Sequence, residues 1–134
     1  MKKYLLAAVI GLLATPAFAQ FDIIISKKHQ SMTVYEDGQL VDVWYVSTAR
    51  RGYHTPSGTF HPYSYQPMHY SKKFDNAPMP HSIFFSGGFA IHATPHTINL
   101  GRAASHGCVR LHPNHAAELY NMTKGHPTTI RILE

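Results

Sequence analysis

The 134-residue chain contains a single cysteine, Cys108, so its sulfur has no partner for an internal disulfide. Such a thiol either packs as an inert apolar group, binds a metal ion or reacts as a nucleophile. Charged residues make up only 14% of the sequence, and the basic ones occur as scattered pairs rather than as a continuous stripe. This charge distribution excludes nucleic acid as the main partner of the protein.

The N-terminal apolar run, residues 5–13, is too short to span a bilayer comfortably. It follows Lys2 and Lys3 and precedes Ala17-Phe18-Ala19, which has small residues at the two positions that a signal peptidase reads. We therefore expect residues 1–19 to be a cleaved signal peptide and residues 20–134 to form one domain, with an uncleaved anchor as the alternative. In an oxidising compartment an unpaired thiol is unusual, which marks it as a candidate reactive group.

No repeat, low-complexity tract or flexible linker interrupts residues 20–134. Residues 21–26 are apolar and β-branched, and residues 31–36 alternate between apolar and polar side chains. Asp37-Gly38 separates this second run from a third, residues 39–47. An Asp-Gly pair between two such runs indicates a type I′ turn, because both central residues need positive φ. The first half of the domain is therefore predicted to be a β-meander.

The middle of the chain is rich in residues that break regular structure. Residues 50–58 have a turn former at nearly every second position, which excludes a helix or strand there. Residues 59–63 are expected to form a short strand. Residues 64–80 contain three prolines among aromatics and methionines, which predicts a long irregular loop. Loops of that length are usually lids or binding loops, the alternative being a solvated excursion.

The last third combines short strands with one helix. Residues 113–124 have Pro113 in the first turn, Gly125 as a stop, and buried-type side chains at i, i+3, i+4 and i+7. The segments expected to be strands are residues 83–85, 89–92, 109–111 and 128–133. The patterns together predict a mainly β domain with one packed helix.

His92 and Cys108 form the candidate reactive pair. His92 ends one predicted strand, Cys108 begins the next structured segment, and residues 93–105 are long enough to bring the strand ends side by side. A histidine so placed can take the thiol proton and return it to a leaving amine. Gly107 leaves room for a substrate carbonyl to approach the backbone amides around Cys108. The plain alternatives are a hydrogen-bonded core histidine and a buried apolar thiol.

The eleven histidines keep a metal-binding module among the alternatives. His112 and His115 are spaced i, i+3 at the start of the predicted helix, but no spacing repeats as a ligand set would. His106 and Arg110 flank the sulfur and add polar or positive character. Taken one by one, these residues leave open whether the sulfur packs as an apolar group, binds a metal ion or acts as a nucleophile. The joint occurrence of His92, Gly107 and Cys108 favours a nucleophile.

Ile91-His92-Ala93, followed by Ser105-His106-Gly107-Cys108-Val109-Arg110-Leu111, resembles the signature of the L,D-transpeptidase catalytic domain family. Residues 55–60 resemble the family's T-P-x-G-x-F turn, and residues 77–80, 84–91 and 100–102 resemble further family segments. The resemblance covers most of residues 20–134. It implies the family's fold, which is mainly β, with β-sandwich-like mixed sheets and one packed α-helix.

By this resemblance, Cys108 is the nucleophile and His92 is the proton donor and acceptor. Ala93 supplies the backbone carbonyl that orients the imidazole, and His106 and Gly107 shape the oxyanion site. The predicted substrate-binding residues are Ser105, Arg110, Arg50, Arg51 and Tyr63. Arg110 stands where some branches of the family carry asparagine, so its role stays open. No metal or organic cofactor is required.

The implied activity is peptidoglycan L,D-transpeptidation. The thiol attacks the carbonyl of the third stem residue, usually meso-diaminopimelate, expels terminal D-alanine and passes the acyl group to an amine. The implied partners are stem peptides, which give 3→3 cross-links, a lipoprotein lysine or a free D-amino acid, while water gives L,D-carboxypeptidase activity. The short gap between His92 and Ser105 predicts the Gram-negative branch, and hence a periplasmic protein, expected to be a monomer. A sortase-like transpeptidase is disfavoured because its histidine lies much further upstream.

Overall fold

The computed structural model describes residues 18–134, so the predicted signal peptide, apart from its last two residues, lies outside the described part of the chain. In order, its elements are β1 Phe21–Ser26, β2 Ser31–Glu36, β3 Gln39–Tyr45, β4 Gly58–Phe60, β5 Ser64–Ser71, 3-10 helix η1 Lys72–Phe74, β6 Ala77–Ser86, β7 Phe89–Ala93, 3-10 helix η2 Thr97–Asn99, β8 Val109–Leu111, α1 Pro113–Thr123 and β9 Thr128–Leu133. Within residues 18–134, no helix has the length and apolar character needed to cross a membrane.

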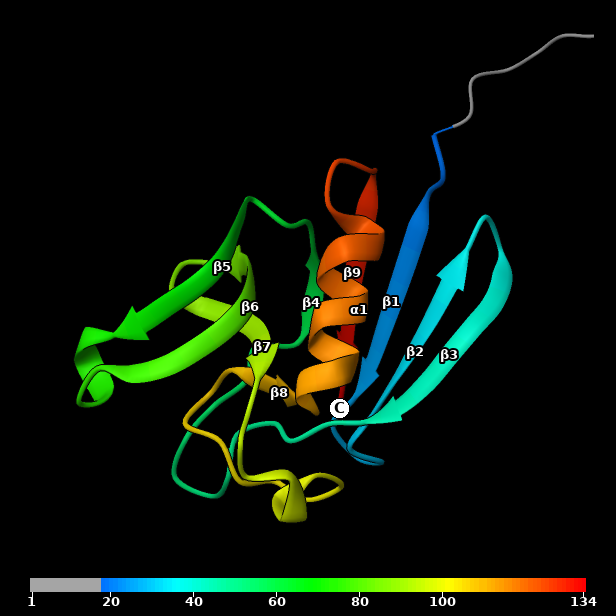
Figure 1. Cartoon of the computed structure of the whole chain (residues 1–134). Helices are drawn as coiled ribbons and strands as arrows, with labels where there is room; N and C mark the ends of the chain where they lie inside the picture. The colour runs from blue at the N-terminus through cyan, green and yellow to red at the C-terminus, as the bar shows by residue number, and fades with distance from the viewer. Residues whose placement is uncertain (1–17) are drawn as a thin grey trace, which may run out of the picture.

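The strands form two mixed sheets, one of five strands in the order β3-β2-β1-β9-β4 and one of four in the order β5-β6-β7-β8. The pairs β1–β9 and β7–β8 are parallel, and the other pairs are antiparallel. Helix α1 lies between the two sheets (Figure 1). The fold class expected from the sequence is confirmed.

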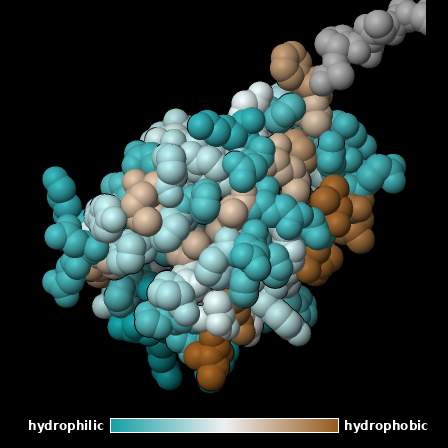
Figure 2. Space-filling view, in the orientation of Figure 1, coloured by the Kyte–Doolittle hydropathy of each residue, from teal (hydrophilic) through white to brown (hydrophobic). Residues whose placement is uncertain are grey.

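The predicted β2–β3 hairpin is present, with φ of 51° at Asp37 and 83° at Gly38. Both angles are positive, as a type I′ turn requires. The alternation of β2 is also confirmed, because Met32 and Val34 are fully buried. Strand β3 is the edge of its sheet, and apolar side chains gather on that side of the molecule (Figure 2). The exposed large apolar residues of β3 are Leu40, Val41, Val43 and Tyr45.

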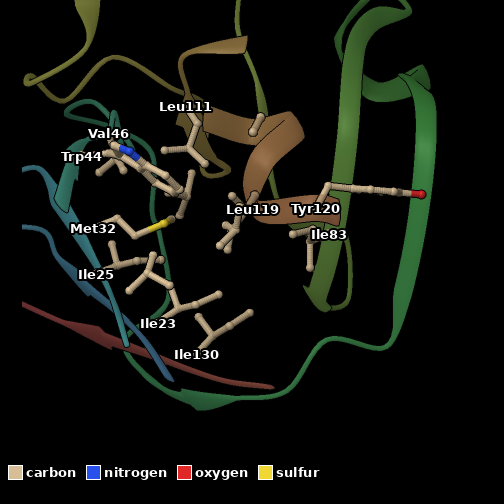
Figure 3. Packing of buried hydrophobic residues seen from close by; sticks show 14 of the residues in the cluster. Ile23, Ile25, Met32, Trp44, Val46, Ile83, Leu111, Leu119, Tyr120 and Ile130 are labelled. Carbon is tan, nitrogen blue, oxygen red and sulfur yellow. The ribbon is translucent and has the colours of Figure 1, made fainter. Parts of the chain in front are cut away.

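The main hydrophobic core lies between the five-stranded sheet and α1 (Figure 3). Ile23 and Ile25 of β1 and Leu119 of α1 are fully buried in it, and each such side chain contributes about 1.5–3 kcal/mol. The predicted helical stripe is confirmed, since the buried residues of α1 are Ala116, Leu119, Tyr120 and Thr123. Burial of this stripe fixes α1 against β6 and β7, which carry part of the site.

The irregular loop predicted at residues 64–80 is wrong. These residues form the hairpin β5–β6, with η1 at its tip, in which Pro78 lies opposite Tyr70 and Pro80 opposite Met68. Prolines two residues apart have the same orientation in a ladder, and this end of β6 pairs with β5 alone. A proline nitrogen can therefore face the unpaired side without losing a hydrogen bond.

Candidate active site

Strand alternation puts the reactive residues on one face of the four-stranded sheet. In the parallel β7–β8 pair, Ile91 lies opposite Val109 and His92 lies opposite Arg110. Ile91 and Val109 belong to the main core, so His92 and Arg110 point to the other face. Cys108 precedes Val109 and is also on that other face, where it packs against a small second cluster, Met79, Phe84 and Ala90.

This face of the sheet and the β5–β6 hairpin enclose a cavity of about 490 Å³. The volume is in the range of small-molecule and peptide side-chain sites. The predicted site residues that line the cavity are Cys108, His92, Ala93, His106, Gly107 and Arg110. Predicted site residues from two segments of the chain, 92–93 and 106–110, thus converge on one cavity that contains the single thiol.

The Cys108 thiol is half-buried, with its sulfur 3.8 Å from the Gly88 carbonyl oxygen. Burial raises the pKa of the thiol, while a backbone hydrogen bond with Ala90 and the charge of Arg110 partly lower this pKa. The thiol form is therefore favoured at rest, and attack on a substrate requires a base to remove the proton.

His92 is only 7% exposed, and its Nδ1 lies 2.7 Å from the Ala93 carbonyl oxygen. Because a carbonyl only accepts, we assign the proton to Nδ1, which leaves Nε2 as a hydrogen-bond acceptor. The pKa of His92 is lowered to about 4, chiefly by burial. The charges of Arg110 and His69 also lower this pKa, whereas the hydrogen bond to Ala93 raises it. At neutral pH the imidazole is a neutral base, with the orienting contact that the sequence analysis assigned to Ala93.

His92 should also make the stability of the fold depend on pH. Its pKa falls from 6.5 to about 4 on folding, so the unfolded chain binds the proton first as the pH drops. The neutral His92 imidazole therefore contributes to the free energy of unfolding. This contribution is fully present above pH 6.5 and is lost as the pH falls towards 4. Its size is about 3 kcal/mol. Urea unfolding at pH 7.5 and pH 4 should show that His92→Gln loses less stability than the wild type, and equal losses would contradict this assignment.

Ser105 holds the turn before the cysteine. Its hydroxyl donates to the Cys108 carbonyl oxygen at 2.6 Å and accepts from the Gly107 N–H at 3.0 Å. Ser105 is fully buried and does not line the cavity. In this structure its hydroxyl is engaged inside the turn and positions the cysteine, while a role of Ser105 in binding substrate stays a prediction.

Gly107 is required by the local geometry of the turn. Its φ is +139°, and an added Cβ would lie 2.8 Å from the Phe89 ring and 2.9 Å from the His54 carbonyl oxygen. Its N–H already donates to Ser105, so the oxyanion role predicted for this residue cannot rest on that amide without breaking the turn. What its missing side chain provides is close packing of the turn against β7 and the 50–58 loop.

Replacing Gly107 with alanine should therefore destabilise the protein by about 2–4 kcal/mol, through backbone strain and two close contacts. Gly88→Ala is the matched control, because a Cβ there meets nothing within 4 Å. We expect that control to stay within about 0.5 kcal/mol of the wild type in urea unfolding. Similar losses in the two variants would show that the contacts of Gly107 are not what the turn depends on.

Arg50, Arg51 and Tyr63 are not among the residues that line the cavity, and their role in substrate binding stays a prediction. Tyr63 is 61% exposed, and its hydroxyl donates to the Gly87 carbonyl. Arg50 places its guanidinium 4.8 Å from the centre of the Tyr53 ring. Arg51 is exposed. The lysines that do line the cavity, Lys72 and Lys73, lie at the hairpin tip instead.

An aromatic stack at the cavity mouth was missed by sequence reasoning. The His106 ring stacks on Phe74 at 4.3 Å and 28°, and packs against Tyr53 at 4.7 Å. Arg50 continues the stack on Tyr53. Burial, Arg50 and Arg110 lower the pKa of His106, which favours the neutral ring. The stack joins three segments far apart in the sequence, and no local pattern marks such a contact.

The histidines considered as metal ligands have other contacts. His115 stacks on Trp44 at 4.8 Å, and His112 Nδ1 accepts from the Asn114 N–H at the start of α1. Across residues 18–134, no group of three histidine, cysteine, aspartate or glutamate side chains is arranged to hold a metal ion. The i, i+3 pair therefore belongs to helix capping and packing in this structure.

The site and fold together define a mainly β protein with a neutral histidine on β7 and a cysteine directly before the adjacent strand β8. Residues 20–132 match the model of the L,D-transpeptidase catalytic domain, and the chain belongs to this family, as the signature predicted. No curated protein matches the chain significantly.

Solved structures similar to the chain include an L,D-transpeptidase from Stackebrandtia nassauensis, at 29% identity and a TM-score of 0.77, covering 85% of this chain and 55% of that one. An L,D-transpeptidase from Mycobacterium smegmatis has 23% identity and a TM-score of 0.78, covering 87% and 59%. L,D-transpeptidase 3 from Mycobacterium tuberculosis, in complex with a faropenem-derived adduct, has 21% identity and a TM-score of 0.76, covering 87% and 61%. The chain thus spans less than two thirds of each of these proteins.

Proposed function

We propose that the protein is a peptidoglycan L,D-transpeptidase that works through an acyl-enzyme on Cys108. The observation that carries the proposal is the placement of Cys108 and His92 on one face of the sheet, in one cavity. Membership of the family supports the reaction class. The faropenem-derived adduct of a structurally similar protein supports the use of a penem as a probe of the same chemistry here.

In the proposed mechanism, His92 takes the thiol proton as the sulfur of Cys108 attacks the carbonyl of the third stem residue. The backbone N–H of Cys108 is the amide next to the sulfur that can stabilise the oxyanion, because the N–H of Gly107 already donates to Ser105. Collapse of the tetrahedral intermediate breaks the bond to D-alanine, and His92 returns the proton to the leaving amine.

The thioester is then resolved by an amine, whose attack regenerates the thiol and forms a new amide bond. The proposed acceptors are the diaminopimelate amine of a second stem, a lipoprotein lysine and a free D-amino acid. Water as acceptor would release a tripeptide, which is the L,D-carboxypeptidase outcome. We place the reaction in the periplasm and expect a monomer, as predicted from the sequence.

The test is incubation of the purified protein with a tetrapeptide stem, with and without an amine acceptor, followed by mass spectrometry of the products. Release of D-alanine together with a 3→3 dimer supports transpeptidation. Release of D-alanine with tripeptide alone assigns carboxypeptidase activity. A tetrapeptide left intact under all acceptor conditions would contradict the proposed function.

A further inference from the structure

We propose that the tip of the β5–β6 hairpin, through Lys72 and Lys73, binds a carboxylate of the acyl donor and selects donors that are negatively charged. This inference rests on the proposed function and deepens it, because it assigns donor selection to two residues outside the cysteine signature. The argument starts from the charges on the cavity wall.

The cavity wall carries positive charge without any negative charge to balance it. Lys72, Lys73 and Arg110 line it, and none of the lining residues is aspartate or glutamate. Asp75, the acidic residue nearest to the lysines in sequence, is exposed and does not line the cavity. In the described part of the chain the single ion pair lies elsewhere, so these three cations have no carboxylate partner. Such a wall favours an anionic ligand.

The hairpin tip is held beside the reactive cysteine by aromatic contacts. Phe74, the last residue of η1, stacks on His106, which is two residues from Cys108. Lys73 lies with its Nζ 5.6 Å from the centre of the Phe74 ring. The stack therefore fixes the position of the two preceding lysines relative to the sulfur. Their ammonium groups can reach a donor that lies in the cavity and still remain hydrated when the cavity is empty.

Arg110 of β8 supplies a third cation to the cavity wall. Its guanidinium is half-buried, donates to the Ala104 carbonyl oxygen at 3.4 Å and is near enough to Cys108 to lower the pKa of the thiol. Cations from two separate elements, η1 and β8, that line one cavity fit a ligand with more than one carboxylate. The stem tetrapeptide is such a ligand, with free carboxylates at its second residue, at diaminopimelate and at the terminal D-alanine. The lysines would bind one of these groups, and Arg110 would remain for another.

The experiment measures donor binding without turnover, in the full protein carrying Cys108→Ala. Affinity is determined by calorimetry for the tetrapeptide with free carboxylates and for peptides in which each carboxylate in turn is a carboxamide. Lys72→Gln with Lys73→Gln should weaken binding of the free acid about twofold to tenfold, as expected for the loss of two exposed charge pairs. One of the carboxamides should then bind equally well with and without the lysines, which identifies the carboxylate concerned.

Lys28→Gln is the matched control, because Lys28 is an exposed lysine in the turn between β1 and β2, outside the cavity wall. It should leave all affinities unchanged. Unchanged affinity of the double lysine variant for the free acid would overturn the inference, as would equal losses for the acid and every carboxamide. The calorimetric affinities are measured without catalysis. A failed turnover assay would therefore overturn the proposed function, whereas only the affinities decide whether the lysines bind the carboxylate.

Discussion

Replacing Cys108 with alanine should reduce D-alanine release from a tetrapeptide stem by about 10⁴-fold or more, which is the scale for loss of a covalent nucleophile. The half-buried thiol is the single sulfur of this type in the chain and lies in the cavity that also contains His92. No other lining side chain has comparable nucleophilicity at neutral pH. Mass spectrometry of the released D-alanine and of the remaining stem measures the effect.

The same variant should stay folded. Cys108 packs with only the small cluster of Met79, Phe84 and Ala90, and it is not part of the main core. The free energy of unfolding should therefore change by about 1 kcal/mol or less. A variant that is folded by this measure and still releases D-alanine at a rate within tenfold of the wild type would contradict the assignment of Cys108.

Replacing His92 with glutamine should lower kcat by about 10²–10⁴-fold, the usual range for a general base. The reason is that the pKa of the thiol is raised, so few molecules carry the thiolate unless a base removes the proton. The residual activity of the variant should increase steadily with pH, as the thiolate forms without assistance. The wild type should instead be active from mildly acidic pH, because the pKa of its base is about 4. Rate measurements across pH 5–9 on both proteins test this.

His106→Gln is the control for this assignment, because His106 is the histidine closest to Cys108 in the sequence. Its ring stacks between Phe74 and Tyr53 at the cavity mouth, where it holds the hairpin. We expect a smaller loss of kcat for this variant than for His92→Gln, together with a higher KM. A pH profile of His92→Gln that coincides with that of the wild type would instead assign the base to another group.

The parts of the fold and site that the sequence predicted are those determined by local chemistry. The β2–β3 hairpin could be predicted from Asp37-Gly38 alone, because a type I′ turn depends on the two central residues and not on the rest of the sheet. The stripe of α1 follows from helical periodicity. The proximity of His92 and Cys108 could be predicted because each lies at one end of a predicted strand. When the two strands pair, side chains alternate between the two faces of the sheet, so both residues can lie on the same face.

The β5–β6 hairpin could not be predicted in this way. Its prolines are tolerated because one end of β6 has no neighbour except β5, and the number of neighbours of a strand is a property of the folded sheet. Arg50-Arg51 and Lys72-Lys73 are both pairs of exposed basic residues, and the sequence alone does not tell which pair lines the cavity. Lys72 and Lys73 line the cavity together with the adjoining Phe74, which stacks on His106.

The central claim is that Cys108 is acylated, and the most direct test is intact-mass spectrometry after incubation with faropenem. The account predicts a single covalent adduct, which peptide mapping places on the segment that contains Cys108, and no adduct on the Cys108→Ala protein. Absence of an adduct on the folded wild type, or an adduct that persists in Cys108→Ala, would contradict it.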